Sequence, residues 1–106
     1  MQILVRTHHP EAAQLRETVE RRARFAFRRL KALVPRADIT LDDINGPRGG
    51  ADKRCQIALR TDGAGPVVVV SVAKDWRCAL DKALASAAHH LLRAWRRNNT
   101  PRRQQR

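Results

Sequence analysis

The sequence predicts an α+β fold: a two-layer sandwich with the element order β-α-β-β-β-α, in which two helices pack on one face of a four-stranded mixed sheet. Three observations support this prediction. The chain has 106 residues, about one small domain with a single core. Its apolar residues recur every three to four positions near both ends and every second position in between. Turn-forming Gly and Pro separate the segments of period two.

The first predicted unit is a strand followed by a long helix. Residues 2–7 (QILVRT) have the composition of a short strand, and residues 11–34 have helical periodicity. Pro10 suits the first turn of this helix, and Pro35 ends it. A helix that joins two strands usually leaves them parallel, so we expect the next strand to lie parallel to the first.

The middle of the chain predicts three strands. Residues 39–43 and 55–60 alternate between the two faces of a half-buried strand. Between them lies NGPRGGADKRC, residues 45–55, which lacks the G-x-x-x-x-G-K-[ST] spacing of a phosphate-binding loop and predicts a wide hairpin connection. A second turn, residues 61–66, leads to VVVVSV at 67–72. This strand is apolar on both faces at most positions, so we expect it in the interior of the sheet.

Residues 75–97 return to helical spacing, and the remaining NNTPRRQQR predicts a disordered basic tail. We therefore expect one domain over 1–97 and a tail over 98–106. No apolar run approaches the roughly 18 residues that cross a bilayer. The first residues also lack the pattern of a secretory signal. We expect a cytoplasmic protein with no membrane partner.

Charge is the strongest functional signal in the sequence. Twenty-two Lys and Arg face ten Asp and Glu, which gives a net charge of +12 and an isoelectric point near 11.6. The excess is +6 over residues 1–36, zero over 37–74 and +6 over 75–106, and no acidic residue occurs from 21 to 37. Like charges on one helix repel each other, so we expect a polyanionic partner to neutralise them.

Helical spacing places these charges on the solvent faces of the two predicted helices, where they would form one basic ridge. Arginine dominates, which favours bidentate contacts with phosphate. Aromatic residues are few and Tyr is absent, so we expect a structured RNA rather than bases stacked on the sheet. The expected RNA-binding residues are Arg21, Arg22, Arg24, Arg28, Arg29 and Lys31 on the first helix and Lys82, His89, Arg93, Arg96 and Arg97 on the second.

Other classes of site find little support in the sequence. The candidate metal ligands are His8, His9, Cys55, Cys78, His89 and His90. Adjacent helical residues point about 100° apart, and no H-x-x-x-H or C-x-x-C pair occurs, so we expect no metal and no cofactor. We expect both thiols to be buried. Without a nucleophile elbow, a triad or a carboxylate pair on one face, we expect no enzyme activity and no small-molecule substrate.

Three segments resemble the ribosome hibernation-promoting factor and ribosome-associated inhibitor family: LRETVERRARF in the first helix, DDINGPRGGADKRCQIAL across the hairpin and VVVVSVAKDWRCALDKALASAAHHL at the end. The resemblance covers nearly all of residues 1–95. It implies the same element order, and it implies binding to small-subunit rRNA in the channel used by messenger and transfer RNA, through basic residues on the two helices. Arg22, Arg28 and Arg93 keep basic positions of the family, whereas Phe25, Ser86 and His89 depart from it.

The resemblance also implies a biological role. Family members silence the ribosome under stress, and we expect this chain to act likewise and to be a monomer off the ribosome. The 45–55 segment is similar to that of short, arginine-rich members, and this similarity implies further RNA contacts at Arg48, Lys53 and Arg54 near the hairpin. Long members carry a second domain that pairs ribosomes, and we expect this chain to lack that activity by itself. Two alternatives stay open: a general structured-RNA or nucleic-acid-binding protein, and a regulator that binds acidic protein surfaces.

Overall fold

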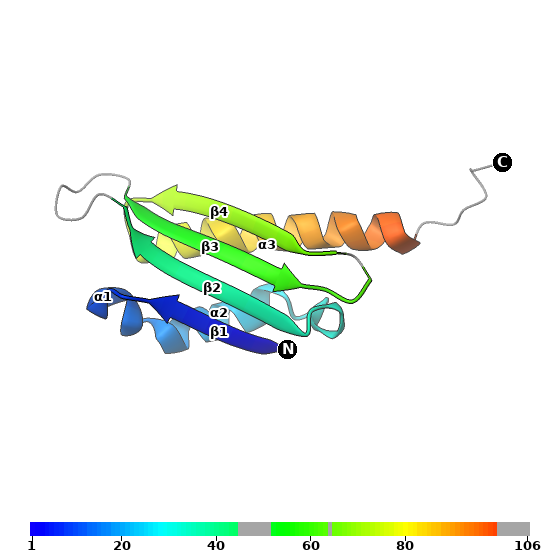
Figure 1. Cartoon of the computed structure of the whole chain (residues 1–106), viewed down its shortest axis with the longest axis horizontal. Helices are drawn as coiled ribbons and strands as arrows, with labels where there is room; N and C mark the ends of the chain where they lie inside the picture. The colour runs from blue at the N-terminus through cyan, green and yellow to red at the C-terminus, as the bar shows by residue number, and fades with distance from the viewer. Residues whose placement is uncertain (45–51, 64, 100–106) are drawn as a thin grey trace.

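The computed structural model describes residues 1–44, 52–63 and 65–99, and within them it has the predicted two-layer α+β fold (Figure 1). One layer is a four-stranded sheet, and the helices form the other layer against one of its faces. The elements are β1 (Gln2–Thr7), α1 (Pro10–Ala13), α2 (Arg16–Ala26), a 3₁₀ turn (Lys31–Leu33), β2 (Arg36–Asp43), β3 (Lys53–Arg60), β4 (Val67–Ala73) and α3 (Trp76–Asn99).

The strands lie in the order β1-β2-β3-β4, with β1 parallel to β2 and the other two pairs antiparallel. The register aligns Val5 with Ile39, Ile39 with Ile57, and Ile57 with Val69. These four side chains form an apolar row that crosses the whole sheet on the side of the helices, and all of them are buried. The mixed sheet expected from the sequence is therefore confirmed, including its parallel first pair.

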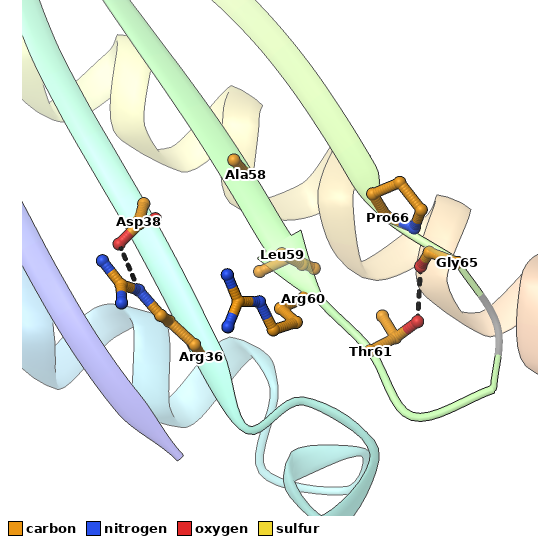
Figure 2. A pocket seen from close by; sticks show the side chains of 8 residues that line it. All are labelled: Arg36, Asp38, Ala58, Leu59, Arg60, Thr61, Gly65 and Pro66. Atoms are coloured by element: carbon orange, nitrogen blue, oxygen red, sulfur yellow. Dashed lines mark hydrogen bonds and ion pairs between the residues drawn. The ribbon is translucent and has the colours of Figure 1, made fainter.

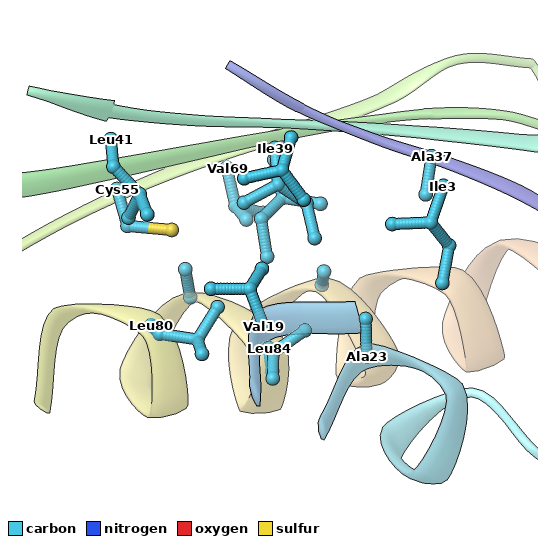
Figure 3. Packing of buried hydrophobic residues seen from close by; sticks show 14 of the residues in the cluster. Ile3, Val19, Ala23, Ala37, Ile39, Leu41, Cys55, Val69, Leu80 and Leu84 are labelled. Carbon is cyan, nitrogen blue, oxygen red and sulfur yellow. The ribbon is translucent and has the colours of Figure 1, made fainter. Parts of the chain in front are cut away.

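The core lies between this row and the helices, as Figure 3 shows. From α2, Val19 and Ala23 point toward the sheet, and from α3, Leu80 and Leu84 do so. Each of these side chains is at most 4% exposed. Because residues three and four apart share a helix face, this contact leaves Arg21 and Arg22 of α2 and Asp81 and Lys82 of α3 outside the core.

The first helix is much shorter than the predicted 11–34. It breaks after Ala13, resumes as α2 and ends at Ala26, after which Phe27 enters the core with no exposed surface. A 24-residue helix would be about 36 Å long, whereas six-residue β1 spans only about 20 Å. Since the chain must return to begin β2 beside β1, it leaves the helix early. The apolar periodicity of the sequence does not predict this limit on helix length.

The last helix shows no such limit, because no strand follows it within the described residues. α3 is 24 residues long and extends past the end of the sheet in Figure 1. It continues to Asn99, so the first two residues of the predicted tail are helical, and residues 100–106 lie outside the described part of the chain. Within the described ranges, no helix is both long enough and apolar enough to cross a membrane.

The prediction that 67–72 is an interior strand is wrong, because β4 lies at the edge of the sheet. Its alternate residues Val67 and Val69 face the helices, but Val68 and Val70 lie on the opposite face and are 59% and 49% exposed. A strand that is apolar on both faces usually lies between two others. Here the second apolar face is open to solvent instead.

Both predicted hairpin connections join the strands that the sequence indicated. In the turn between β3 and β4, Gly63 and Gly65 have φ of 85° and 80°, a conformation that side chains with a Cβ rarely adopt. The connection between β2 and β3 begins with a backbone hydrogen bond of 2.9 Å from Ile44 to Asp52. The rest of that predicted loop, residues 45–51, is outside the described residues.

Candidate nucleic-acid interface

The candidate site is the outer surface formed by α2 and α3, which run in the same direction against the sheet (Figure 1). Residues 16–33 and 76–99 together carry twelve Lys and Arg against three Asp and Glu. Because the apolar residues of both helices face the sheet, most of these charges lie at the surface. Three of these arginines contact a neighbouring side chain, Arg22 with Asp81, Arg24 with Glu20 and Arg28 with Phe25, and these contacts limit which cations can meet a ligand.

On α2 the arginines differ in their partners. Arg22 reaches across to α3, where one of its terminal nitrogens lies 2.9 Å from Oδ1 and 3.1 Å from Oδ2 of Asp81. Arg24 lies 3.9 Å from Glu20 and donates a hydrogen bond of 3.2 Å to the carbonyl of Met1. Arg21 is exposed and makes no ion pair with any described residue. It is the cation of α2 best placed to meet an anionic ligand.

The segment after α2 carries the rest of the first basic group. The guanidinium carbon of Arg28 lies 4.0 Å from the ring centroid of Phe25, and a terminal nitrogen of Arg28 donates to the Phe25 carbonyl at 2.8 Å. Arg29 and Lys31 are exposed and unpaired among the described residues. The predicted stripe from Arg21 to Lys31 therefore does not follow a single helix, because its second half lies beyond Ala26.

On α3, Lys82, His89 and Arg93 are all exposed, and neither Lys82 nor Arg93 has an ion-pair partner within the described ranges. His90, beside His89, instead contacts the Ser86 carbonyl through Nδ1 at 2.8 Å. In the last turns, Arg96 and Arg97 are exposed, where positive charge also favours the C-terminal end of the helix dipole.

The two basic groups do not merge into the continuous ridge that the sequence predicted. Asp81 faces α2, since it pairs with Arg22. Lys82 follows Asp81 in the sequence and therefore points about 100° further round the helix, with Arg93 on the same stripe. The basic stripe of α3 consequently lies on the solvent side, turned away from the flank that meets α2.

Between the two helices lies a groove of about 500 Å³, which we call the interhelical groove. Its residues are Arg21, Arg22, Phe25 and Ala26 from α2 and Arg77, Asp81, Leu84 and Ala85 from α3. Sequence reasoning missed Arg77, because it is not in phase with the Lys82 stripe. It noted Phe25 only as a departure from a family pattern. The feature of the sequence that could have indicated this groove is the aromatic residue Phe25 among the arginines of the first helix.

The three basic residues near the hairpin lie apart from the helix surface. Lys53 pairs with Asp43 at 2.9 Å and with the buried Asp52 at 3.3 Å, and its side chain is only 17% exposed. The hydrogen bond to Asp43 is the largest cause that raises the pKa of Lys53. Arg54 lies on the open face of the sheet, 3.7 Å from Asp42. Arg48 is outside the described residues.

The open face of the sheet has a hollow of about 380 Å³ at the end of β3, shown in Figure 2. Arg36 and Arg60 are register partners there. Arg36 is paired with Asp38 at 3.0 Å, whereas Arg60 has no ion-pair partner among described residues. These cations lie on the side of the sheet opposite the helices, so the structure does not bring them together with Arg21 or Arg93.

The candidate metal ligands are dispersed. His9 accepts a hydrogen bond through Nε2 from the Asp43 backbone at 3.2 Å, and its ring packs against Trp76. In the described part of the chain, no three His, Cys, Asp or Glu side chains form a group that could hold a metal. Burial raises the pKa of the Cys55 thiol to about 12.

The prediction of two buried thiols is correct for Cys55 and wrong for Cys78, which is exposed. Cys78 is the third residue of α3, and its backbone N–H donates to a carboxylate oxygen of Asp75 at 2.8 Å. The same carboxylate accepts from the thiol and raises the pKa of Cys78.

Fold and surface together define a small α+β domain with a basic helix layer and an open sheet. The crystal structure of the N-terminal domain of Protein Y from Thermus thermophilus is similar, with a TM-score of 0.65 and 21% sequence identity over 87% of this chain and 93% of that one. No protein-family model and no curated protein matches the sequence. At this identity, the similarity to the Protein Y domain confirms the fold.

Proposed function

We propose that this protein binds ribosomal RNA of the small subunit through the outer surface of α2 and α3 and thereby inhibits translation. The observation that carries the proposal is the twelve-to-three excess of basic residues in these helical segments. Several of the cations, Arg21, Lys82 and Arg93 among them, make no ion pair within the described ranges. A polyanion laid along this surface would supply the missing counter-charge.

RNA is the polyanion that best suits these side chains. Like charges three or four residues apart repel each other by a few tenths of a kcal/mol per pair, and phosphates relieve that repulsion. Arginine also binds phosphate with two parallel hydrogen bonds. The open sheet face has mixed charge, so the RNA is expected on the helix side only.

Two findings favour the ribosome as the source of that RNA. Three segments of the sequence resemble the hibernation-promoting factor family, whose members use the same two helices. The chain also has the element order of that family, and the Protein Y domain shares its fold. In the proposed mechanism, the helix surface binds phosphates that line the channel for messenger and transfer RNA. The bound protein then excludes both ligands, and the ribosome becomes inactive.

The proposed contacts are the exposed basic residues of the helix surface together with Arg22, which is half-buried beside Asp81. They are Arg21, Arg22, Arg24, Arg28, Arg29 and Lys31 on the first side of the surface and Lys82, His89, Arg93, Arg96 and Arg97 on the second. Lys53 is better explained by its two carboxylate partners, and Arg54 faces the other side of the sheet. Phosphate contacts carry no sequence information, so recognition depends on the shape of the RNA.

The test is co-sedimentation of the purified protein with small subunits, large subunits and a naked RNA duplex. The proposal predicts stoichiometric binding to small subunits and much weaker binding to large subunits and to the naked duplex, and competition by transfer RNA would locate the site in the channel. Arg93→Glu should weaken this binding. Arg60→Glu is the matched control, because it reverses an exposed charge of the open sheet face, and it should bind like the unaltered protein.

Other outcomes distinguish the alternatives. Equal binding to all three RNAs would replace the proposal with a general structured-RNA binder. Binding to none of them would contradict RNA recognition and favour an acidic protein partner, whose capture would survive nuclease treatment. If Arg60→Glu weakened binding to small subunits and Arg93→Glu did not, the helix surface would be the wrong face.

A further inference from the structure

We infer that the interhelical groove receives one unpaired base of the bound RNA, which stacks on the ring of Phe25. This inference rests on the proposed function and adds a ligand class and a residue role to it. Phosphate contacts alone would need only the charges of the helix surface. They do not explain an apolar groove with an exposed aromatic side chain in the centre of that surface.

Phe25 has an unusual environment for its residue type. Its side chain is 65% exposed, the highest value among the large apolar residues described. It therefore contributes little to the core, unlike Phe27, which is completely buried two residues later. Arg28 lies over one face of the ring and is held there by its hydrogen bond to the Phe25 carbonyl. The ring is thus positioned, while much of its surface stays accessible.

The lining of the groove matches a nucleotide. Ala26, Leu84 and Ala85 supply an apolar floor, and a volume of about 500 Å³ lies within the range of small-ligand sites. Aromatic rings and arginine planes are the surfaces on which proteins stack unpaired RNA bases. A base inserted beside Phe25 would therefore gain stacking and would also cover apolar surface.

The charges at the rim identify the occupant as a nucleic acid. Arg21, Arg22 and Arg77 line the groove against the single carboxylate of Asp81. An apolar peptide segment would leave these guanidinium groups near its backbone without counter-charge, whereas the phosphates on either side of a flipped base would neutralise them. The charge of the rim is therefore complementary to that of a nucleotide strand.

Asp81 adds a preference among bases. Its carboxylate already accepts two contacts from Arg22, at 2.9 Å and 3.1 Å. An ionised carboxylate has about four acceptor positions, so two remain for N–H groups of a ligand. A base with an exocyclic amino group would donate to them. The groove is therefore expected to favour such a base over uracil.

The test uses an RNA hairpin with a single bulged 2-aminopurine, a fluorescent base that carries an amino group, and the same hairpin fully paired. Binding of the unaltered protein should quench the fluorescence of the bulged base. Phe25→Leu should lower affinity for the bulged hairpin about five- to 150-fold, the loss expected for one base–aromatic stack. Its affinity for the paired hairpin should not change, and Phe25→Trp should retain binding and quenching.

The controls separate this inference from the proposed function. Phe25 is mostly exposed, so an unchanged melting temperature should show that Phe25→Leu is folded. If the unaltered protein binds both hairpins without quenching, or if Phe25→Leu binds the bulged hairpin equally well, the base site is wrong and the phosphate surface stands. If the unaltered protein binds neither hairpin nor small subunits, the proposed function itself fails.

Discussion

Arginines of the helix surface differ in whether they have an ion-pair partner, and this difference decides which of them can meet a ligand. Arg22 and Arg21 are neighbours in the sequence, yet Arg22 is held by Asp81 and Arg21 has no ion-pair partner in the described ranges. Both residues were predicted as RNA contacts from the same charge pattern. Local spacing in the sequence shows which residues are cations. It does not show that Arg22 pairs with Asp81, 59 positions away, because that contact depends on how the two helices pack.

The two thiols give a direct test at the residue scale. We expect iodoacetamide at pH 8 to modify Cys78 in the folded protein and to leave Cys55 unmodified, because Cys55 is fully buried. Asp75→Asn should accelerate the modification of Cys78. The carboxylate of Asp75 holds the thiol in its protonated form, and removing it raises the fraction of reactive thiolate. Mass spectrometry of the labelled peptides measures both results.

In urea both thiols should react, and Asp75→Asn should have little effect there. Labelling of Cys55 in the folded protein would contradict its position in the core.

The burial of Cys55 also determines how the free energy of unfolding changes at alkaline pH. The unfolded thiol ionises near its ordinary pKa of 9.0 and the folded one only near about 12, so the free energy of unfolding should decrease as the pH rises above 9.

At the scale of the element, the length of each helix depends on whether the chain must return to the sheet after it. α2 ends early because the chain must return to start β2, whereas α3 continues past the sheet. The sequence predicted that both helices exist and which faces are apolar. It did not predict where the first one ends, because residues 27–34 keep the same apolar spacing as the helix before them.

Phe25 and Phe27 provide a matched pair for the end of α2. Phe27→Ala should lower the free energy of unfolding by about 3–5 kcal/mol, since the ring is completely buried and its removal leaves a cavity. Phe25→Ala removes the same atoms from a side chain that is 65% exposed, and it should change stability by no more than about 0.5 kcal/mol.

Denaturation in urea, monitored by circular dichroism, measures the change in the free energy of unfolding for both variants. Equal destabilisation by both substitutions would mean that Phe25 is part of the core. A small effect of Phe27→Ala would mean that α2 does not end where the structure places Ala26.

At the scale of the whole molecule, the fold separates surfaces of different charge. The helix layer is strongly basic, whereas on the open sheet face Arg36 and Arg54 are paired with Asp38 and Asp42. The segment counts predicted this division, because the excess charge belongs to the residues on either side of the three central strands. The interhelical groove could not be predicted in this way, since it exists only where two distant segments pack together.

This charge distribution predicts a steep dependence of RNA binding on salt. If about six phosphates are neutralised, the affinity should fall roughly a thousandfold between 50 and 200 mM salt. Fluorescence anisotropy with a labelled RNA hairpin over this range gives the slope of log affinity against log salt concentration. Arg93→Gln should reduce the magnitude of the slope by about one, because it removes one phosphate contact.

The open-face variant Arg60→Gln should leave the slope unchanged. A slope near zero for the unaltered protein would show that electrostatic neutralisation of phosphates is not the basis of binding. A slope reduced equally by both variants would place RNA on both faces of the molecule.

The position of β4 has a consequence for how the protein behaves in concentrated solution. An edge strand with Val68 and Val70 exposed offers backbone groups and apolar side chains to the edge of another chain. The net charge of +12 keeps two such chains apart at low ionic strength. At 1 M salt the screening length shrinks to about 3 Å, and this repulsion is lost. The ionic conditions that would release a bound RNA are therefore those in which the protein is least protected from aggregation.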